Sequence, residues 1–103
     1  MSFRRVLAAA LMLAATPAGA QETAGGRLAQ CPDPDETVRS ECVAYILGWQ
    51  VGYGIFRETC IPEGTTGERM REVFVRYAEA NPQREGDRAR DVIRDAMFDR
   101  WPC

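Results

Sequence analysis

The sequence contains neither histidine nor lysine, and these two absences exclude much of ordinary enzyme chemistry. Without histidine there is no imidazole to act as a general base near neutral pH or to bind zinc. Without lysine there is no Schiff-base amine, no Walker-type phosphate ligand and no polylysine surface. We therefore expect that the chain is not an enzyme and that it acts by binding another molecule.

Long apolar runs are also scarce. One apolar run, which is ten residues long, lies near the N-terminus. Two arginines precede this run at 6–15, which is followed by a proline and the small residues 18–20. This order is typical of a bacterial secretory signal peptide with cleavage after Ala20. The run is too short to span a bilayer, which needs about 20 residues. We predict that residues 1–20 are removed on export and that residues 21–103 form one periplasmic domain without membrane insertion.

The charge balance of the exported part is acidic. Residues 21–103 hold 11 arginines against 15 aspartates and glutamates, a net charge of −4. Phosphate groups would be repelled by such a surface, so we expect no nucleic-acid partner. All four cysteines remain, and an oxidising compartment favours two disulfides. No Cys-x-x-Cys motif is present, and we expect no metal and no cofactor.

Apolar residues recur at three- and four-residue steps through most of the exported chain, which predicts an all-α domain: a single small bundle of three main helices. The first helix is expected to start with Asp33 as its cap and to end near Arg57 or Glu58. A short extra helical turn is possible before Cys31. The apolar stripe of the first helix consists of Val38, Cys42, Tyr45, Ile46, Trp49, Tyr53 and Phe56.

Gly48 and Gly52 interrupt this first helix one turn apart, and each costs about 1 kcal/mol relative to alanine. We expect them to allow the close approach of another helix, and the alternative is a helix that kinks or frays after Gly52. The stripe is mostly a core feature. Tyr53 and Phe56, next to these glycines, are candidate surface anchors for a partner.

Two further helices follow a loop that contains proline and glycine. The second is predicted to begin with Thr65 as its cap and Glu68 three residues later, and to end near Ala80 before Asn81-Pro82. The third is predicted to start around residues 86–87 and to end before Pro102. Its apolar face consists of Ala89, Val92, Ile93, Ala96, Met97 and Trp101.

Aspartates recur at every fourth position of the third helix and suggest a metal or acid–base site. The arginines between them favour a charge-paired, solvated face instead. A glutamate and an arginine four residues apart on the second helix predict another pair of this kind. The residues are Asp91, Asp95 and Asp99 with Arg90, Arg94 and Arg100, and the pair Glu72 and Arg76.

The four cysteines permit three disulfide pairings. If residues 42–57 are helical, Cys42 and Cys60 stand about 20 Å or more apart. A disulfide needs Cα atoms about 4.4–6.8 Å apart, so this pair is excluded unless the helix breaks. We favour Cys31–Cys42 with Cys60–Cys103, and the crossed pairing Cys31–Cys60 with Cys42–Cys103 remains the alternative.

The favoured pairing constrains the start of the first helix. With Asp33 as the cap, Cys42 lies about 13–14 Å along the axis, whereas residues 31–33 reach back about 7 Å. Either the bridge just reaches, or the helix starts nearer Asp35 or Thr37.

Several segments together resemble the Rap/Tai family of type VI secretion immunity proteins. They are residues 60–66 (Cys-Ile-Pro-Glu-Gly-Thr-Thr), Asn81-Pro82, the terminal Trp-Pro-Cys at 101–103, and residues 42–48 (Cys-Val-Ala-Tyr-Ile-Leu-Gly). The resemblance covers about residues 24–103. It implies a small, helical, disulfide-linked periplasmic protein that binds a secreted peptidoglycan amidase effector and blocks its active site.

On this reading the protein is an inhibitor without catalytic residues, and contact with the amidase is expected at the end of the first helix and in the following loop. The alternative is a general small envelope protein, such as an acid-stress chaperone, which the 15 carboxylates would also fit. A homodimer is a further possibility for either function. The candidate contact residues are Tyr53, Phe56, Ile61, Glu63 and Thr65.

Overall fold

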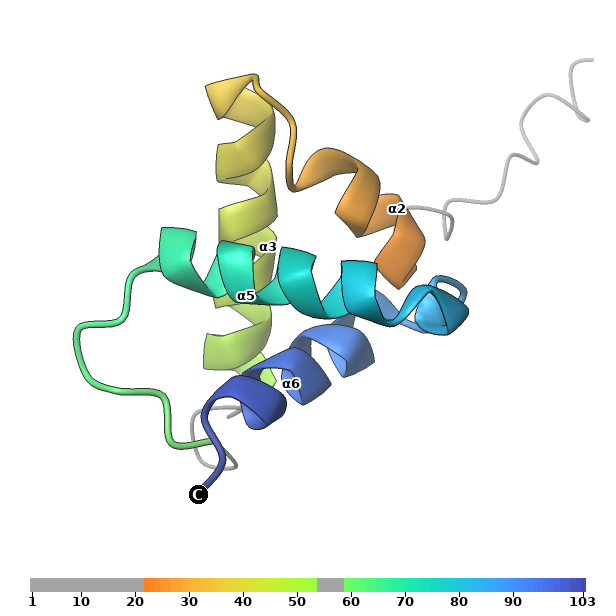
Figure 1. Ribbon diagram of the computed structural model, residues 1–103. Helices are drawn as coiled ribbons and strands as arrows, with labels where there is room; N and C mark the ends of the chain where they lie inside the picture. The colour runs from red at the N-terminus through yellow and green to blue at the C-terminus, as the bar shows by residue number, and fades with distance from the viewer. Residues whose placement is uncertain (1–21, 54–58) are drawn as a thin grey trace, which may run out of the picture.

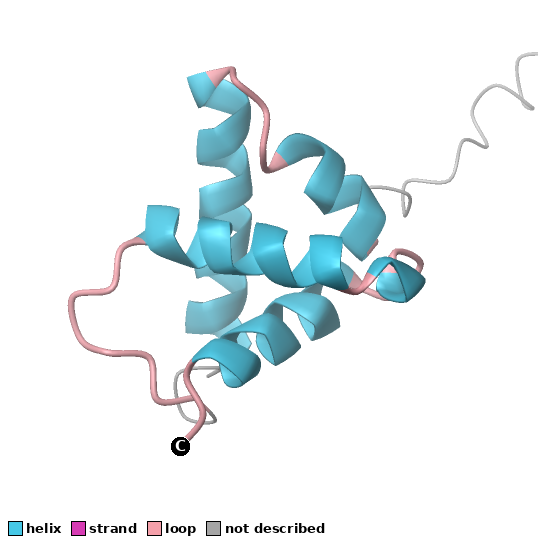
Figure 2. Cartoon of the chain, in the orientation of Figure 1, coloured by secondary structure: helices cyan, strands magenta, loops and turns pink. Residues whose placement is uncertain are grey.

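The computed structural model describes residues 22–53 and 59–103 (Figure 1). The predicted signal peptide and the predicted helix end near Arg57 or Glu58 lie outside the described residues. No strand occurs in the described ranges, and Figure 2 shows helices joined by loops, so the all-α prediction is confirmed. The elements are α2 (Ala24–Gln30), α3 (Glu36–Tyr53), α5 (Gly67–Ala80), a 3-10 turn η2 (Pro82–Arg84) and α6 (Ala89–Arg100).

The central helix is α5, which packs against α3, α6 and the short α2. Figure 1 shows α5 crossing α3 steeply, with α6 below it and α2 near the upper part of α3. The start of α2 is bonded to the turn before α6, because Ala24 N donates to Asp87 O at 2.8 Å and Gly25 N donates to Glu85 O at 2.9 Å. These bonds fix the short helix to the other end of the chain.

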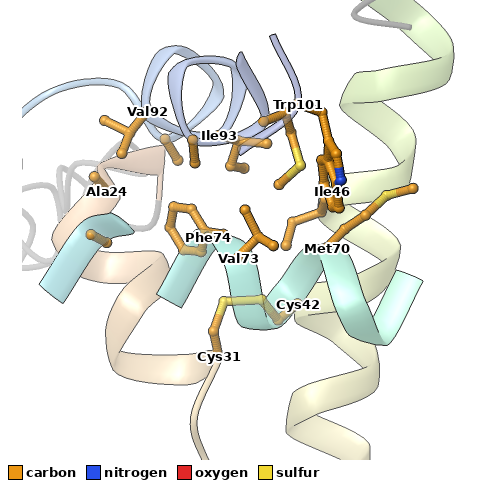
Figure 3. Close-up of a cluster of buried hydrophobic side chains, with 14 residues drawn as sticks. Ala24, Cys31, Cys42, Ile46, Met70, Val73, Phe74, Val92, Ile93 and Trp101 are labelled. Atoms are coloured by element: carbon orange, nitrogen blue, oxygen red, sulfur yellow. A yellow bond between two sulfur atoms is a disulfide. The ribbon is translucent and has the colours of Figure 1, made fainter. Parts of the chain in front are cut away.

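One buried cluster joins all four helices (Figure 3). The apolar face predicted for α6 is confirmed, because its five helical members are buried and Trp101 is 9 % exposed. Phe74 of α5 and Ile46 of α3 are fully buried opposite that face. The buried hydrophobic residues are Ala24, Cys31, Cys42, Ile46, Met70, Val73, Phe74, Ala78, Ala89, Val92, Ile93, Ala96, Met97 and Trp101.

Both favoured disulfides are present. Cys31–Cys42 has a Cα–Cα distance of 5.3 Å, and Cys60–Cys103 has one of 5.1 Å. The first requires the later start of α3. Because α3 begins at Glu36, Cys42 lies only about 9 Å along its axis, within reach of Cys31.

The cap of α3 is Asp35 and not Asp33, so the alternative start nearer Asp35 is confirmed. Asp35 Oδ1 accepts a hydrogen bond from Thr37 N at 2.8 Å, while Asp33 Oδ1 accepts one from Asp35 N at 2.8 Å. Asp33 thus closes a turn in front of the helix. Both aspartates satisfy backbone amides, and the disulfide decides which of them starts α3.

The cap of α5 is Thr66, one residue later than predicted. Its hydroxyl accepts a hydrogen bond from Arg69 N at 3.1 Å. Glu68 does not complete a capping box. Its carboxylate accepts hydrogen bonds from Arg71, which lower the pKa of Glu68 and raise the pKa of Arg71. The predicted end at Ala80 is confirmed.

The two remaining helix starts also differ from the predictions. The turn before Cys31 is a seven-residue helix, α2, because Thr23 caps it by accepting from Gly26 N at 3.2 Å. Helix α6 begins at Ala89, two to three residues later than predicted. A turn at residues 85–87 and an extended Arg88, which forms an isolated bridge with Thr23, occupy the positions where the helix was expected to begin.

The expectation of a close helix contact at Gly48 and Gly52 was wrong. A Cβ atom built at either glycine meets nothing within 4 Å, because both face solvent. The close approach is at Gly67, where a Cβ would lie 2.6 Å from Val43 Cγ1 and 3.1 Å from Leu47 Cδ1. The first turn of α5 therefore depends on glycine to pack against α3.

The charge-paired face of α6 is present for two of its three aspartates. Asp91 pairs with Arg88 and Arg90, and Asp95 pairs with Arg84 and Arg94. Within the described residues, Asp99 has no ion pair. The predicted pair of Glu72 with Arg76 is absent there too, because Glu72 pairs instead with Arg69 at 3.2 Å. Arg76 is exposed and forms no ion pair with a described residue.

Candidate functional site

The loop of residues 59–66 projects from the bundle between the C-terminal end of the chain and the start of α5 (Figure 1). Its first end is fixed to the C-terminus by the disulfide Cys60–Cys103 and by a hydrogen bond from Cys60 N to Trp101 O at 3.0 Å. Its last residue, Thr66, caps α5. The loop is therefore held at both ends while its middle remains exposed.

A tight turn shapes the middle of this loop. Pro62 O accepts hydrogen bonds from Thr65 N at 3.1 Å and from the Thr65 hydroxyl at 2.7 Å. Gly64 has φ +84°, a conformation that favours glycine at the third position of a type II turn. Glu63 lies between Pro62 and Gly64 and is exposed. The turn thus presents one carboxylate on a chain segment with little conformational freedom.

The three loop residues selected from the sequence have different environments. Glu63 is exposed, Thr65 is half-buried and closes the turn, and Ile61 is partly buried against the hydrophobic core. Ile61 therefore anchors the loop to the hydrophobic core. Of the two aromatic candidates, Phe56 lies outside the described residues, and the described backbone of α3 ends at Tyr53.

The aromatic stripe of α3 is partly covered by arginines from other helices. Tyr45 and Trp49 pack edge to face, with ring centroids 5.9 Å apart, and both are partly buried against the core. The guanidinium carbon of Arg27 lies 3.6 Å from the Tyr45 centroid, and that of Arg90 lies 5.5 Å from the Trp49 centroid. These cation–π contacts tie α2 and α6 to α3.

Sequence reasoning missed Arg27 and Arg90 as partners of the aromatic rings. They are 18 and 41 positions away from the rings they cover, and no local periodicity links residues so distant. The uncovered part of α3 beside the two aromatics is a shallow hollow of about 340 Å³ along Ala44, Gly48 and Gly52. This hollow is apolar and open.

The described residues hold no group of three metal-binding side chains from histidine, cysteine, aspartate and glutamate. In the same ranges, no helix is both long and apolar enough to cross a membrane. Arg84 donates hydrogen bonds to Asp87, Asp95 and the Tyr77 hydroxyl. These hydrogen bonds raise the pKa of Arg84. The described surface offers an anchored loop and charged helix faces for recognition.

A sequence model of the Rap1a immunity proteins matches residues 23–103. Comparison with curated proteins and with solved structures returned no significant match. The matched range contains every described helix, the loop at 59–66 and both disulfides.

Proposed function

The chain belongs to the Rap1a immunity protein family, and we propose that it is a non-catalytic periplasmic protein that binds and occludes a secreted peptidoglycan amidase. Family membership implies a partner effector and suggests a non-enzymatic role. The match over residues 23–103 carries this proposal. The amidase as the class of partner comes from the resemblance to the Rap/Tai family of type VI secretion immunity proteins.

The loop at 59–66 is the part of the molecule best suited to plug an enzyme cleft. A disulfide, a backbone hydrogen bond and a helix cap hold its two ends. Because the loop is ordered before binding, its insertion into a cleft costs little conformational entropy. In this mechanism Glu63 enters the cleft, and Ile61 and Thr65 keep the turn in shape. Tyr53 and Phe56 are proposed as further contacts with the partner.

Export is part of the proposal. Two disulfides suggest an oxidising compartment, and the first 20 residues have the sequence pattern of a signal peptide. A peptidoglycan amidase delivered by a type VI system acts in the periplasm, so its inhibitor must be there as well. We propose cleavage after Ala20 and a mature domain of residues 21–103.

The test is capture of a partner from periplasm, followed by rescue of cells that export the captured protein as a toxin. We expect rescue when this chain carries residues 1–20, and no rescue when they are removed so that it stays in the cytoplasm. A captured protein without amidase activity, or toxicity unchanged by the exported chain, would refute the proposal.

A matched pair of variants tests whether the loop makes the contact. Glu63→Arg changes the exposed tip, and Glu79→Arg makes the same charge change on the exposed surface of α5. We expect the first to reduce inhibition at least about tenfold, and the second to leave it within about twofold. Equal effects would show that net charge, and not the loop, determines inhibition.

A general acid-stress chaperone is the competing function. It predicts binding of many unfolded proteins at low pH, with no single tight partner and no difference between the two glutamate variants. An amidase held tightly at neutral pH would exclude it as the main activity.

A further inference from the structure

A second surface begins at the base of the loop. A groove of about 440 Å³ runs between α5 and α6, with the buried residues Val73 and Ala96 at its bottom. Arg69, Arg76 and Arg100 line its edges. Arg69 follows the cap of α5 by three positions, and Arg100 directly precedes Trp101, whose carbonyl bonds the loop. The groove therefore adjoins both ends of the loop at 59–66.

Two of the three arginines that line this groove form no ion pair with a described residue. Arg69 pairs with Glu72, and both side chains stay accessible, at 37 % and 45 % exposed. Across residues 22–53 and 59–103, neither Arg76 nor Arg100 has an ion-pair partner. Asp99 also lines the groove, but it forms no ion pair with these arginines. With Glu72 and Asp99 counted against the three arginines, the groove keeps a net charge of +1 on a domain with a net charge of −4.

The arginines are spaced for an extended ligand and not for a single small anion. Arg69 and Arg76 lie seven positions apart on nearly the same face of α5, which is about 10 Å along the axis. A peptide in the extended polyproline II conformation covers that distance in about three residues and, with three residues per turn, turns every third side chain to the same face. Arg100 adds a third guanidinium from α6 across the groove, and guanidinium groups bind carboxylates through paired hydrogen bonds.

We propose that this groove binds an acidic, extended segment of the partner protein, with carboxylates about three residues apart, as a second contact beside the loop. This inference rests on the proposed function, because it assigns the groove to the same partner. Charge complementarity selects the occupant. The buried apolar bottom accommodates the backbone and the small side chains between the acidic residues.

The test uses the exported, oxidised protein and a synthetic nonapeptide with glutamate at every third position. We expect this peptide to shift the NMR signals of the Arg76 and Arg100 Nε–H groups, and a glutamine version of it to leave them unchanged. Arg76→Gln with Arg100→Gln should weaken peptide binding about five- to tenfold. Raising the ionic strength should weaken it further.

The control removes the same charge from two arginines that do not line the groove. Arg88→Gln with Arg94→Gln leaves the groove intact, and both residues are exposed. We expect peptide binding within about twofold of wild type. Because Arg100 also lies 5.4 Å from the Trp101 ring, Arg76→Gln alone serves as a second variant in which that contact is kept. Melting curves confirm that each variant is folded.

Three results would overturn the proposal: equal loss of binding in the control, equal binding of the glutamine peptide, or the same signal shifts from free glutamate at the same concentration. The last would make the groove a small-anion site. None of these measurements needs an amidase, so the groove and the proposed function fail separately. Rescue without peptide binding refutes the groove alone, and peptide binding without rescue refutes the immunity function alone.

Discussion

Cys31–Cys42 joins two residues that are 0 % and 1 % exposed, whereas Cys60–Cys103 joins two exposed residues at the base of the loop. The inner bridge belongs to the hydrophobic cluster, with which it is drawn in Figure 3. The outer bridge packs no core and fixes a projecting segment to the end of the chain. One kind of bond therefore has two roles: the inner bridge completes the packing, and the outer one orders a binding surface.

Loss of the inner bridge should reduce the stability most. Cys31→Ser with Cys42→Ser removes a cross-link worth about 3 kcal/mol for a sequence separation of 11. It also buries two hydroxyl groups that cost about 1–3 kcal/mol each when they find no partner. We expect this variant to be largely unfolded at 37 °C, as followed by far-UV circular dichroism.

The alanine version of the same pair separates cross-linking from burial. Cys31→Ala with Cys42→Ala loses the bond but introduces no polar group. The free energy of unfolding of the alanine version, measured in urea, should therefore be at least about 2 kcal/mol higher than that of the serine version. Equal stabilities would mean that the site admits water and is not part of a closed core.

The contribution of the outer bridge to stability should come from the cross-link alone, and not from burial of its cysteines. Cys60–Cys103 spans a sequence separation of 43, which the chain-entropy model values at about 4 kcal/mol as an upper figure. We expect Cys103→Ser, and the double change Cys60→Ser with Cys103→Ser, to unfold near 37 °C. Serine and alanine versions should agree within about 0.5 kcal/mol because both positions are exposed.

A melting temperature within a few degrees of wild type would contradict that prediction. It would also mean that the outer bridge contributes mainly to binding of the partner and little to stability. In that case we expect the folded double variant to inhibit the partner less well, because the loop at 59–66 must then be ordered during association.

The sequence was sufficient for the helices and their buried faces, and it reduced the disulfide pairings from three to two, of which the favoured one is present. Apolar spacing identified the buried face of α6, and chain geometry excluded Cys42–Cys60. Helix starts were less well predicted, because neighbouring residues compete for the same role. Asp33 and Asp35 each bond a backbone amide, and Thr65 and Thr66 each form a local hydrogen bond. Tertiary constraints decide between them.

The candidate site was predictable as a segment but not as a surface. Proline and glycine at 62 and 64 marked the loop, and the turn with its positive φ at Gly64 agrees with that. The arginine groove was missed because local spacing paired Arg76 with Glu72, whereas Glu72 pairs with Arg69. Which of two possible partners a glutamate chooses depends on side-chain rotamers, and sequence spacing does not specify them.

Glycine substitutions should also differ between buried and exposed regions, with smaller changes in the free energy of unfolding. Gly67→Ala places a Cβ atom 2.6 Å from Val43 Cγ1, and valine has little freedom to move away. Overpacking of this kind costs about 1–3 kcal/mol, so after the gain in helix propensity we expect a net loss of about 1 kcal/mol. Urea unfolding measures it. A gain in stability would show that the contact between α3 and α5 is looser than the structure has it.

Gly48→Ala should have the opposite sign. No atom lies within 4 Å of the added Cβ, so alanine should stabilise α3 by about 0.5–1 kcal/mol through the reduced entropy of the unfolded chain. The measurement is urea unfolding at two protein concentrations. The predicted gain at both would mean that this face of α3 is free in the isolated protein. A gain at low concentration that vanishes at high concentration would instead place a second copy of the chain in the hollow along Ala44, Gly48 and Gly52, because the new methyl group would then obstruct a homodimer.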